Sequence, residues 1–171
     1  MEGPAPSKGM LLRIPRLGRG GKQMIIYKFR TMHPYAQYLQ SFVFEKNNLK
    51  KGGKFCDDWR ITKWGRFMRT FWLDEIPMLY NWLRGDIKLV GVRPLSKHYF
   101  NLYTEELQKK RLEQKPGLIP PFYADLPETL TEIMNSEVRY LNACVGSPNR
   151  TDLRYGWLAV NNILSGKAKS S

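Results

Sequence analysis

Cysteine, histidine and long apolar runs are scarce in this 171-residue chain. It holds two cysteines, Cys56 and Cys144, and two histidines, His33 and His98. The cysteines lie far apart and without CxxC spacing, which argues against a disulfide scaffold and a structural zinc site. No run of about eighteen apolar residues occurs, and the first ten residues lack the apolar core of a signal peptide. The sequence therefore predicts neither a membrane-spanning helix nor an export signal.

Acidic residues are the second deficit. The chain has 28 Lys and Arg against 15 Asp and Glu, a formal net charge of +13. Residues 1–97 hold 19 of these basic residues and only 7 of the acidic ones. From residue 8 to residue 30, seven basic residues occur with no acidic one. Such a patch attracts phosphates of nucleic acid, anionic lipid or a small substrate, and a solvated basic face is the plain alternative.

Size and apolar content allow one domain of ordinary core size. The chain is 42% hydrophobic and 25% charged, which is typical of a globular protein. We expect a compact, helix-rich single domain over residues 1–171, of the α/β class with α+β as the alternative. A small sheet should lie near the acidic pair described below. Residues 1–9 read as an irregular lead-in.

Hydrophobic spacing and turn residues predict the secondary structure. A Gly-rich turn at 17–22 leads into a strand at 24–32, which suggests half of a hairpin. A strand at 86–94 ends in a Gly-x-Arg-Pro turn. Thr62 is placed to open one helix, and Gly85 to stop another that starts at Leu73 or Asp74. Further helices are predicted at 33–47, 98–114, 128–143 and 152–165, with loops at 47–54 and 146–150.

Two short motifs carry cations suited to phosphate. Lys28 and Arg30 lie two residues apart, so on a strand both project from one face and can hold a diphosphate. An exposed face of an amphipathic strand is the alternative. Arg93 and Pro94 follow an apolar strand and a glycine, where a turn can present a guanidinium to phosphate, although Gly-x-Arg-Pro alone is a common turn. The Gly-rich turn at 17–22 lacks the spacing of a nucleotide fingerprint.

An acidic pair, Asp74 and Glu75, stands in a basic neighbourhood. Arg66, Arg69 and Arg84 flank it in sequence, so its carboxylates should stay ionised. An ionised carboxylate there can act as a nucleophile or as a ligand of Mg²⁺. The alternative is local, because Asp is a favoured N-cap and Glu is at home in a first helical turn.

Taken in order, these stretches resemble the bacterial sugar transferase family, the monotopic phosphoglycosyl transferases that act on polyprenyl phosphate. The matching residues are RLGRGGK at 16–22, YKFRTM at 27–32, DWRITKWGRFMR at 58–69, LDEIPMLYNWLRGDIKLVGVRP at 73–94 and KPG at 115–117. The resemblance covers the chain from about Ser7 to Gly117. It implies amphipathic helices at a membrane interface, where the aromatic residues Trp64, Phe67, Phe71 and Trp72 would lie if they are not inside the core.

The resemblance implies a catalytic role for the acidic pair. Asp74 would attack the β-phosphorus of a UDP-sugar, release UMP and carry a phosphosugar that polyprenyl phosphate then takes. Glu75, together with Asp74, would hold Mg²⁺. Splitting the transfer into two displacements needs a carboxylate nucleophile, a divalent ion and several cations. The substrate-binding residues that it implies are Lys28, Arg30, Arg60, Arg69, Arg93 and Pro94.

The chain also departs from the family pattern. Members carry a hydrophobic N-terminal segment that enters and re-exits the cytoplasmic face of the bacterial inner membrane, and the match here begins just after its place. We therefore expect that the chain starts late and lacks the anchor. The usual Gly-Pro-Arg-Pro is Gly91-Val92-Arg93-Pro94 here. After KPG the sequence diverges, which predicts a distinct helical section at 118–171.

Two other functions remain open at the level of sequence. One is a basic module that docks on nucleic acid through residues 8–30 and 59–72, and the other is a catalytically silent relative acting in an assembly. Binding to a phosphate backbone has no need of an acidic pair among arginines. We therefore expect a UDP-sugar, polyprenyl phosphate and an anionic membrane surface as partners, and no nucleic acid.

Overall fold

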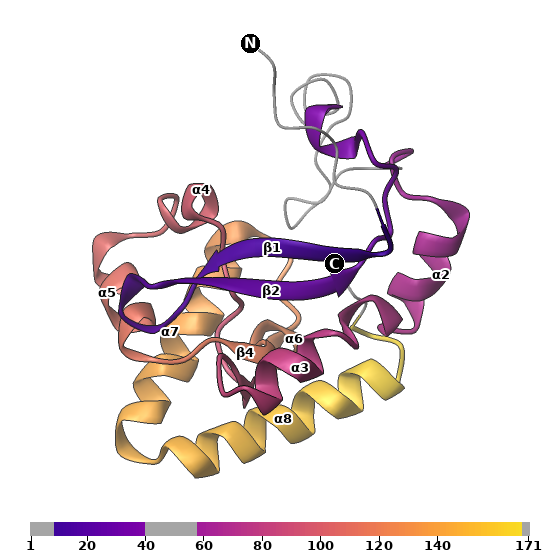
Figure 1. Ribbon diagram of the computed structural model, residues 1–171. Coiled ribbons are helices and arrows are strands. Elements are labelled where there is room, and N and C mark those ends of the chain that lie inside the picture. The colour runs from indigo at the N-terminus through magenta and orange to yellow at the C-terminus, as the bar shows by residue number, and fades with distance from the viewer. Residues whose placement is uncertain (1–8, 40–57, 169–171) are drawn as a thin grey trace.

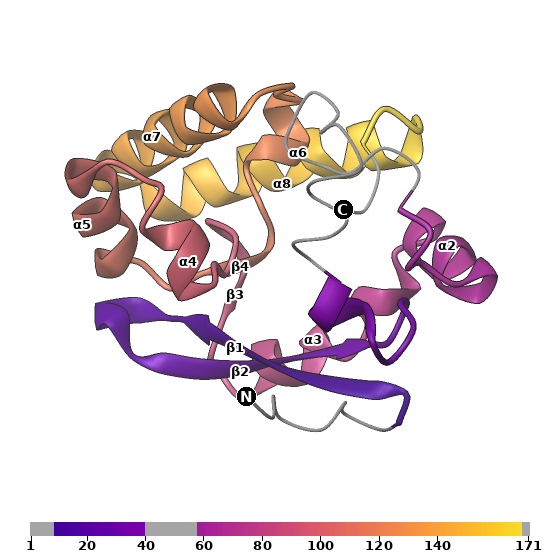
Figure 2. The same cartoon turned by 90° about the horizontal axis from the view of Figure 1, so that it is seen from above.

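The computed structural model describes residues 9–39 and 58–168, which form a mainly helical α/β fold (Figure 1). Its strands pair into two sheets of two strands each. Seen from above, the strands β1 and β2 run along one side and the helices α7 and α8 along the other, with β3 and β4 between them (Figure 2). No helix within the described ranges is long and apolar enough to cross a membrane. The predicted fold class is confirmed.

A β-hairpin forms the N-terminal part of the fold. Strands β1, Leu11–Leu17, and β2, Gln23–Phe29, pair antiparallel with Leu11 opposite Phe29. The turn is the 3₁₀ segment Arg19–Gly21, where Gly20 and Gly21 have φ of 68° and 74°, a backbone region that favours glycine. The predicted hairpin is confirmed, although its second strand ends at Phe29 rather than at residue 32.

Helix α2, Lys63–Thr70, begins where the sequence predicts. The Thr62 hydroxyl accepts a hydrogen bond from the Gly65 amide at 2.8 Å, which caps the helix. A Cβ at Gly65 would overlap the Thr31 carbonyl, so glycine lets the helix pack directly on the chain that follows β2. Of the helix predicted at 33–47, residues 33–39 are described. They are not α-helical, and within them only Ala36–Leu39 form a helical turn, the 3₁₀ segment η2. The rest of that helix and the loop at 47–54 lie outside the described residues.

The helix predicted from Leu73 or Asp74 to Leu83 is wrong in its first half. Residues Leu73–Glu75 form a separate 3₁₀ turn, η3, and helix α3 spans only Met78–Leu83. Pro77 lacks an N–H and cannot donate to the carbonyl four residues earlier, so the ladder breaks there. Gly85, with φ of 75°, ends the segment as predicted.

The second sheet joins distant parts of the sequence. Strand β3, Lys88–Val90, pairs parallel with β4, Gly117–Ile119. Strand β3 is shorter than the strand predicted at 86–94 and lies within it. The Gly117 amide donates to Val92 O at 2.9 Å, and the Gly91 amide donates to Ile119 O at 3.1 Å. A Cβ at Gly117 would overlap the backbone of Gly91, so the KPG stretch ends in glycine because two backbones meet there.

The helix predicted at 98–114 is two helices. Residues Lys97–Phe100 form α4 and Glu105–Glu113 form α5. The Thr104 side chain accepts a hydrogen bond from the Leu107 amide at 3.4 Å and caps the start of α5. An N-cap residue has non-helical backbone angles, so the helix before it cannot run on through Thr104.

The C-terminal section is helical, as predicted. It comprises α6 (Phe122–Asp125), α7 (Leu130–Gly146) and α8 (Pro148–Leu164). The loop predicted at 146–150 is too long, since Ser147 alone separates α7 from α8. Pro148 lies at the start of α8, where its missing N–H breaks no helical hydrogen bond.

A partly buried polar cluster ties α7 and α8 to β3. Lys88 contacts both carboxylate oxygens of Asp152, at 2.8 and 3.0 Å. The Tyr140 hydroxyl lies 2.5 Å from Asp152 Oδ1 and 3.2 Å from Val90 O. Around it, the main core packs β3 and the turn after it against α5 and α7. The buried members are Val90, Val92, Leu95, Tyr103, Leu107, Tyr140, Leu141 and Cys144.

Replacing Gly117 by alanine should destabilise the fold by about 1–3 kcal/mol or more, because the added methyl overlaps Gly91. Gly146→Ala is the matched control, since a Cβ there meets nothing within 4 Å. It should be neutral or slightly stabilising. Urea unfolding of both variants measures the difference. Equal free energies of unfolding would contradict the close approach of β3 and β4.

Candidate active site

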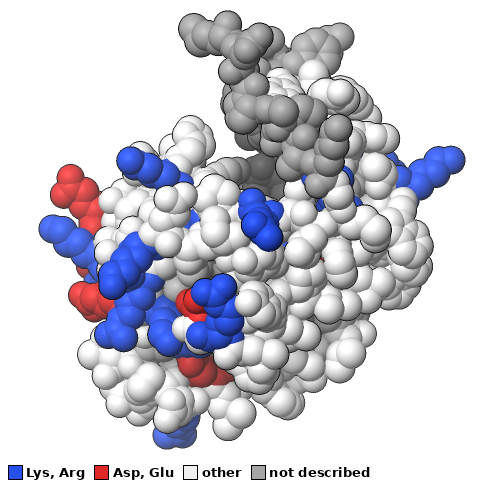
Figure 3. All heavy atoms as spheres, in the orientation of Figure 1, with Lys and Arg blue, Asp and Glu red and all other residues white. Residues whose placement is uncertain are grey.

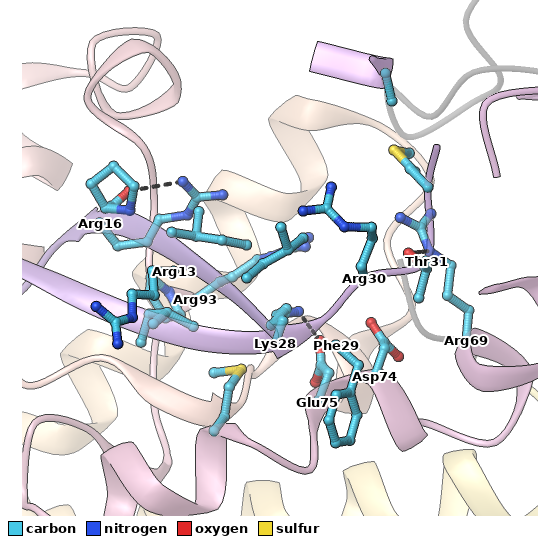
Figure 4. Close-up of a pocket in the computed structure, with 18 of the residues that line it drawn as sticks. Arg13, Arg16, Lys28, Phe29, Arg30, Thr31, Arg69, Asp74, Glu75 and Arg93 are labelled. Carbon is cyan, nitrogen blue, oxygen red and sulfur yellow. Dashed lines mark hydrogen bonds and ion pairs between the residues drawn. The ribbon is translucent and has the colours of Figure 1, made fainter. Parts of the chain in front are cut away.

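A cavity of about 500 Å³ lies beside the hairpin. Its wall comes from β1, β2, α2, η3, the turn after β3 and the segment after β4. In Figure 4 the pair Asp74 and Glu75 lies below β2, with Lys28, Arg30 and Arg69 around it and Arg93 farther along the same wall. Residues separated by more than forty positions along the chain, such as Lys28 and Glu75, therefore meet in one pocket.

The acidic pair lies on η3 and is buried, with Asp74 3% and Glu75 9% exposed. Trp72, not Asp74, occupies the N-cap position of this turn. The reading of Asp74 as an N-cap is therefore wrong, although both acids lie in the first turn of η3. Trp72 has φ of 61°, a left-handed conformation that costs a non-glycine residue about 1 kcal/mol or more. Its ring packs against that of Tyr123 at a centroid distance of 4.5 Å, which holds the turn that carries the acids.

The two carboxylates have different surroundings. Lys28 Nζ donates to Glu75 Oε1 and forms an ion pair with it. Burial raises the pKa of Asp74, against the opposing charges of Lys28 and Arg69 and with the help of the charge on Glu75. Burial thus opposes the expected effect of the arginines at Asp74, because it makes the ionised form of this carboxylate costly.

The predicted cations reach the pocket, but they differ in their other contacts. Arg30 Nε donates to Gly9 O at 2.8 Å, and Arg69 Nε donates to Thr31 Oγ1 at 3.0 Å. Burial lowers the pKa of Arg69, despite the charges of Asp74 and Asp58. Lys28 is paired with Glu75, and Arg93 and Pro94 line the wall formed by the turn after β3.

Arg60 is the most enclosed of these cations. It is 2% exposed and makes a two-point contact with Asp58, at 2.8 and 2.6 Å, while its Nη1 donates to Ala36 O at 3.2 Å. Burial alone would raise the pKa of Asp58, but the hydrogen bonds and charge of Arg60 bring it below its ordinary value. The Arg60 guanidinium thus ties the chain after β2 to the segment before α2 at the edge of the pocket.

Two pocket cations escaped the sequence reasoning as individual site residues. Arg13 and Arg16 of β1 line the cavity, and their only signal was membership of the basic run before residue 30. Burial, and next the charge of Arg93, lower the pKa of Arg16. Arginines crowded in this way favour an anion between them, because a phosphate would relieve both effects. Leu118, Pro120 and Tyr123 of the divergent section also line the cavity.

Comparison with known proteins identifies the family. The chain matches the family model of the bacterial sugar transferases over residues 5–155. It belongs to the bacterial sugar transferase family. It is 44% identical over 103 residues to the uncharacterized sugar transferase EpsL of Bacillus subtilis (strain 168), covering 60% of the chain and 45% of that relative. This membership does not favour a nucleic-acid-binding module.

Relatives with more specific names match as well. The galactosyl transferase CpsE of Streptococcus agalactiae serotype III (strain NEM316) is 37% identical over 131 residues, which are 74% of the chain and 29% of that relative. The UDP-glucose:undecaprenyl-phosphate glucose-1-phosphate transferase of Xanthomonas campestris pv. campestris is 30% identical over 149 residues, covering 82% and 28% respectively. The chain spans less than half the length of each of these three relatives.

The pocket of this sugar transferase fits Mg²⁺ held jointly with a phosphate. Among residues 9–39 and 58–168, no group of three or more His, Cys, Asp or Glu side chains could hold a metal ion alone. Asp74 and Glu75 offer a smaller donor set of carboxylate oxygens in the pocket. Mg²⁺ is commonly bound by one or two carboxylates and completed by substrate phosphates and water. The two carboxylates could therefore hold a magnesium ion only together with ligands from outside the protein, such as phosphate and water.

An exposed aromatic cluster lies on α2 and at its C-cap, beside the site. Trp64, Phe67 and Phe71 are 61%, 45% and 59% exposed. Trp64 and Phe67 stack at 5.1 Å, and Phe67 and Phe71 lie 4.9 Å apart. Trp72, in contrast, is partly buried and packs against Tyr123. Figure 3 shows lysine and arginine over the left and centre of one face, while the surface over α3 and the C-terminal half of α8 is almost uncharged.

The raised pKa of Asp74 predicts a pH-dependent stability. The Asp74 carboxyl binds its proton more tightly in the folded protein than in the unfolded protein. Its contribution to the free energy of unfolding is therefore fully present below its ordinary pKa and is lost as pH rises through the raised pKa. Asp74→Asn should therefore gain stability over wild type as pH rises through this window. Urea unfolding at several pH values, with divalent cations chelated, measures this. A difference that is constant with pH would contradict the burial of an ionisable Asp74.

Proposed function

We propose that this chain is the catalytic part of a phosphoglycosyl transferase that moves a sugar 1-phosphate from a UDP-sugar to a polyprenyl phosphate. The observation that carries the proposal is the buried pair Asp74 and Glu75 inside a pocket lined by arginines and a lysine. Relatives named for transfer to undecaprenyl phosphate support it. Two anionic substrates and a carboxylate nucleophile repel one another, and the surrounding cations offset that repulsion.

Asp74 is the nucleophile in this proposal. One of its carboxylate oxygens attacks the β-phosphorus of the UDP-sugar, and the bond from that phosphorus to the bridging oxygen breaks. UMP leaves with the bridging oxygen, and the sugar phosphate stays on Asp74 as an acyl phosphate. An oxygen of polyprenyl phosphate then attacks the same phosphorus and frees Asp74. A carboxylate with a raised pKa is a stronger nucleophile once it is ionised, which suits the first step.

Glu75 and the cations orient the phosphates. The ion pair with Lys28 holds the Glu75 carboxylate beside Asp74. The positive charge of Arg69 favours the ionised form of Asp74. The negative charge that develops on the transferred phosphoryl group would be stabilised by Lys28, Arg30 and Arg69. The diphosphate would be bound by Arg93. Asp74 and Glu75 would hold Mg²⁺, which supplies charge neutralisation on the phosphate oxygens.

We also propose that the chain works against an anionic membrane surface. The exposed aromatic cluster of α2 is accompanied on the same helix by the exposed cations Lys63 and Arg66. Aromatic rings with nearby cations suit the boundary between lipid headgroups and acyl chains. A polyprenyl phosphate embedded in that surface would present its phosphate to the pocket from the membrane.

Replacing the nucleophile should abolish turnover. Asp74→Asn should lower UMP release from UDP-sugars, with Mg²⁺ and a short-chain polyprenyl phosphate, by at least about 1,000-fold. Glu75→Gln should lower it by about 10- to 100-fold, and a chelator should remove it. Asp125→Asn, which alters an exposed ion pair with Arg139, is the matched control and should retain full activity. Full turnover of Asp74→Asn would overturn the assignment of the nucleophile.

The covalent intermediate can be observed directly. Incubation with a UDP-sugar and Mg²⁺ but no acceptor should add the mass of a sugar phosphate to the intact chain. The added mass should be missing from Asp74→Asn and should disappear when polyprenyl phosphate is added. An unmodified wild-type chain that nevertheless turns over would favour direct transfer in a single displacement.

Removing the α2 aromatics should weaken membrane binding. The double substitution Trp64→Ser and Phe67→Ser should reduce cosedimentation with anionic phospholipid vesicles by about tenfold. The reason is that two large apolar side chains that would be buried in the membrane are removed. Tyr99→Ser alters a 47% exposed ring on α4, away from α2 (Figure 1), and should bind like wild type. Equal losses in both variants would place the contact elsewhere.

A further inference from the structure

A buried charge pair lies outside the pocket, between two helices that carry none of the predicted site residues. Glu137 of α7 is 0% exposed and Arg111 of α5 is 6% exposed. Arg111 Nη1 donates to Glu137 Oε2. Removing two charges from water is costly, and apolar residues of similar volume often stabilise a core as well or better. A buried ion pair is therefore weak evidence of a role in stability alone.

The second arm of Arg111 leads to the pocket. Its Nη2 donates to the backbone carbonyl of Arg93 at 2.5 Å. The guanidinium also lies over the Tyr103 ring, 5.0 Å from its centroid, which limits the directions it can adopt. Arg111 thus connects the carboxylate of Glu137 to the peptide group between Arg93 and Pro94. Because that peptide group is held, so is the point from which the Arg93 side chain departs.

Other hydrogen bonds hold the neighbouring peptides of the same turn. Val92 O accepts from the Gly117 amide at 2.9 Å, and Leu95 O accepts from the Leu17 amide at 3.0 Å. The turn is therefore fixed to β4, β1 and, through Arg111, α5. From it the Arg93 guanidinium extends along the pocket wall shown in Figure 4, 5.9 Å from the ring centroid of Phe122.

Glu137 is incompletely satisfied. Within the described part of the chain, its Oε1 and the neighbouring Ser136 Oγ are buried without a hydrogen-bond partner. Burial raises the pKa of Glu137, against the opposing charges of Arg111 and Arg93. The Glu137 carboxylate attracts the Arg111 guanidinium and so holds it in one orientation. Without Glu137, Arg111 would be a buried cation whose orientation no opposite charge determines.

We propose that Glu137 and Arg111 are positioning residues that orient Arg93 to bind a diphosphate in the pocket. They touch no substrate and act through the Arg93 carbonyl. The inference rests on the proposed function only in assigning that diphosphate to the sugar donor. It gives the C-terminal helical section a part in the site, because Glu137 lies on α7.

Binding of inorganic pyrophosphate to the whole chain, measured by calorimetry, tests the proposal without any turnover. Glu137→Gln keeps the size of the side chain and should weaken binding roughly tenfold, a typical coupling within one hydrogen-bond network. Glu106→Gln is the matched control, because it removes an exposed ion pair with Lys110 on the same helix as Arg111. It should bind within about twofold of wild type.

A double-mutant cycle separates positioning from general destabilisation. In an Arg93→Gln background, Glu137→Gln should cause no further loss of pyrophosphate binding, because the group through which it acts is gone. An equal loss in both backgrounds would overturn the proposal. If Glu137→Gln fails to fold, Arg111→Lys serves instead, since lysine keeps the charge facing Glu137 but lacks the second planar arm. It should show the same loss in folded protein, and wild-type affinity would overturn the proposal.

Failure of this proposal and failure of the proposed function have different signatures. If wild type binds pyrophosphate and Glu137→Gln binds it weakly, yet no UDP-sugar yields UMP, the positioning role stands and the transferase reaction does not. If UMP release is normal in wild type and Glu137→Gln binds pyrophosphate with unchanged affinity, the positioning role is overturned. Wild type that binds no pyrophosphate would also overturn it.

Discussion

The close approach of the backbones at Gly91 and Gly117 is the constraint on which the site depends. Only glycine at Gly117 leaves room for the two backbones to meet, and the resulting hydrogen bonds hold β3 and β4 side by side. This contact joins the N-terminal half, which carries the hairpin and the acidic pair, to the C-terminal helices. The turn after β3 follows from it directly, and so does the place of Arg93 in the pocket wall.

The chemistry of the pocket comes from a balance of burial and charge. Buried arginines next to one another are short of anions, while a buried Asp74 is costly to ionise. A phosphorylated substrate would offset the first imbalance, and a cation that arrives with it would offset the second. Under the proposed function, a metal-bearing diphosphate would offset both imbalances, as a phosphoryl transfer requires.

Local sequence signals predicted the local features well. Thr62 opened a helix as an N-cap, Gly85 ended one, and the glycines at 17–22 formed the turn of a hairpin, because each depends on the conformational preferences of a few adjacent residues. The boundaries that failed were also set by single residues. Pro77 broke the helix that was expected to begin at the acidic pair, and Thr104 divided the helix expected at 98–114.

The sequence by itself determined the chemical inventory and the family of this protein: an acidic pair among cations, a Lys-x-Arg strand and an Arg-Pro turn, in an order that identifies a sugar transferase. The tertiary structure alone decided which cation serves which partner. It directed Lys28 to Glu75, brought Arg60 to the backbone carbonyl of Ala36, and brought Glu137 through Arg111 to the turn of Arg93. The reason is physical, since chain order and residue type set local conformation, whereas burial and pairing depend on which distant segments pack together.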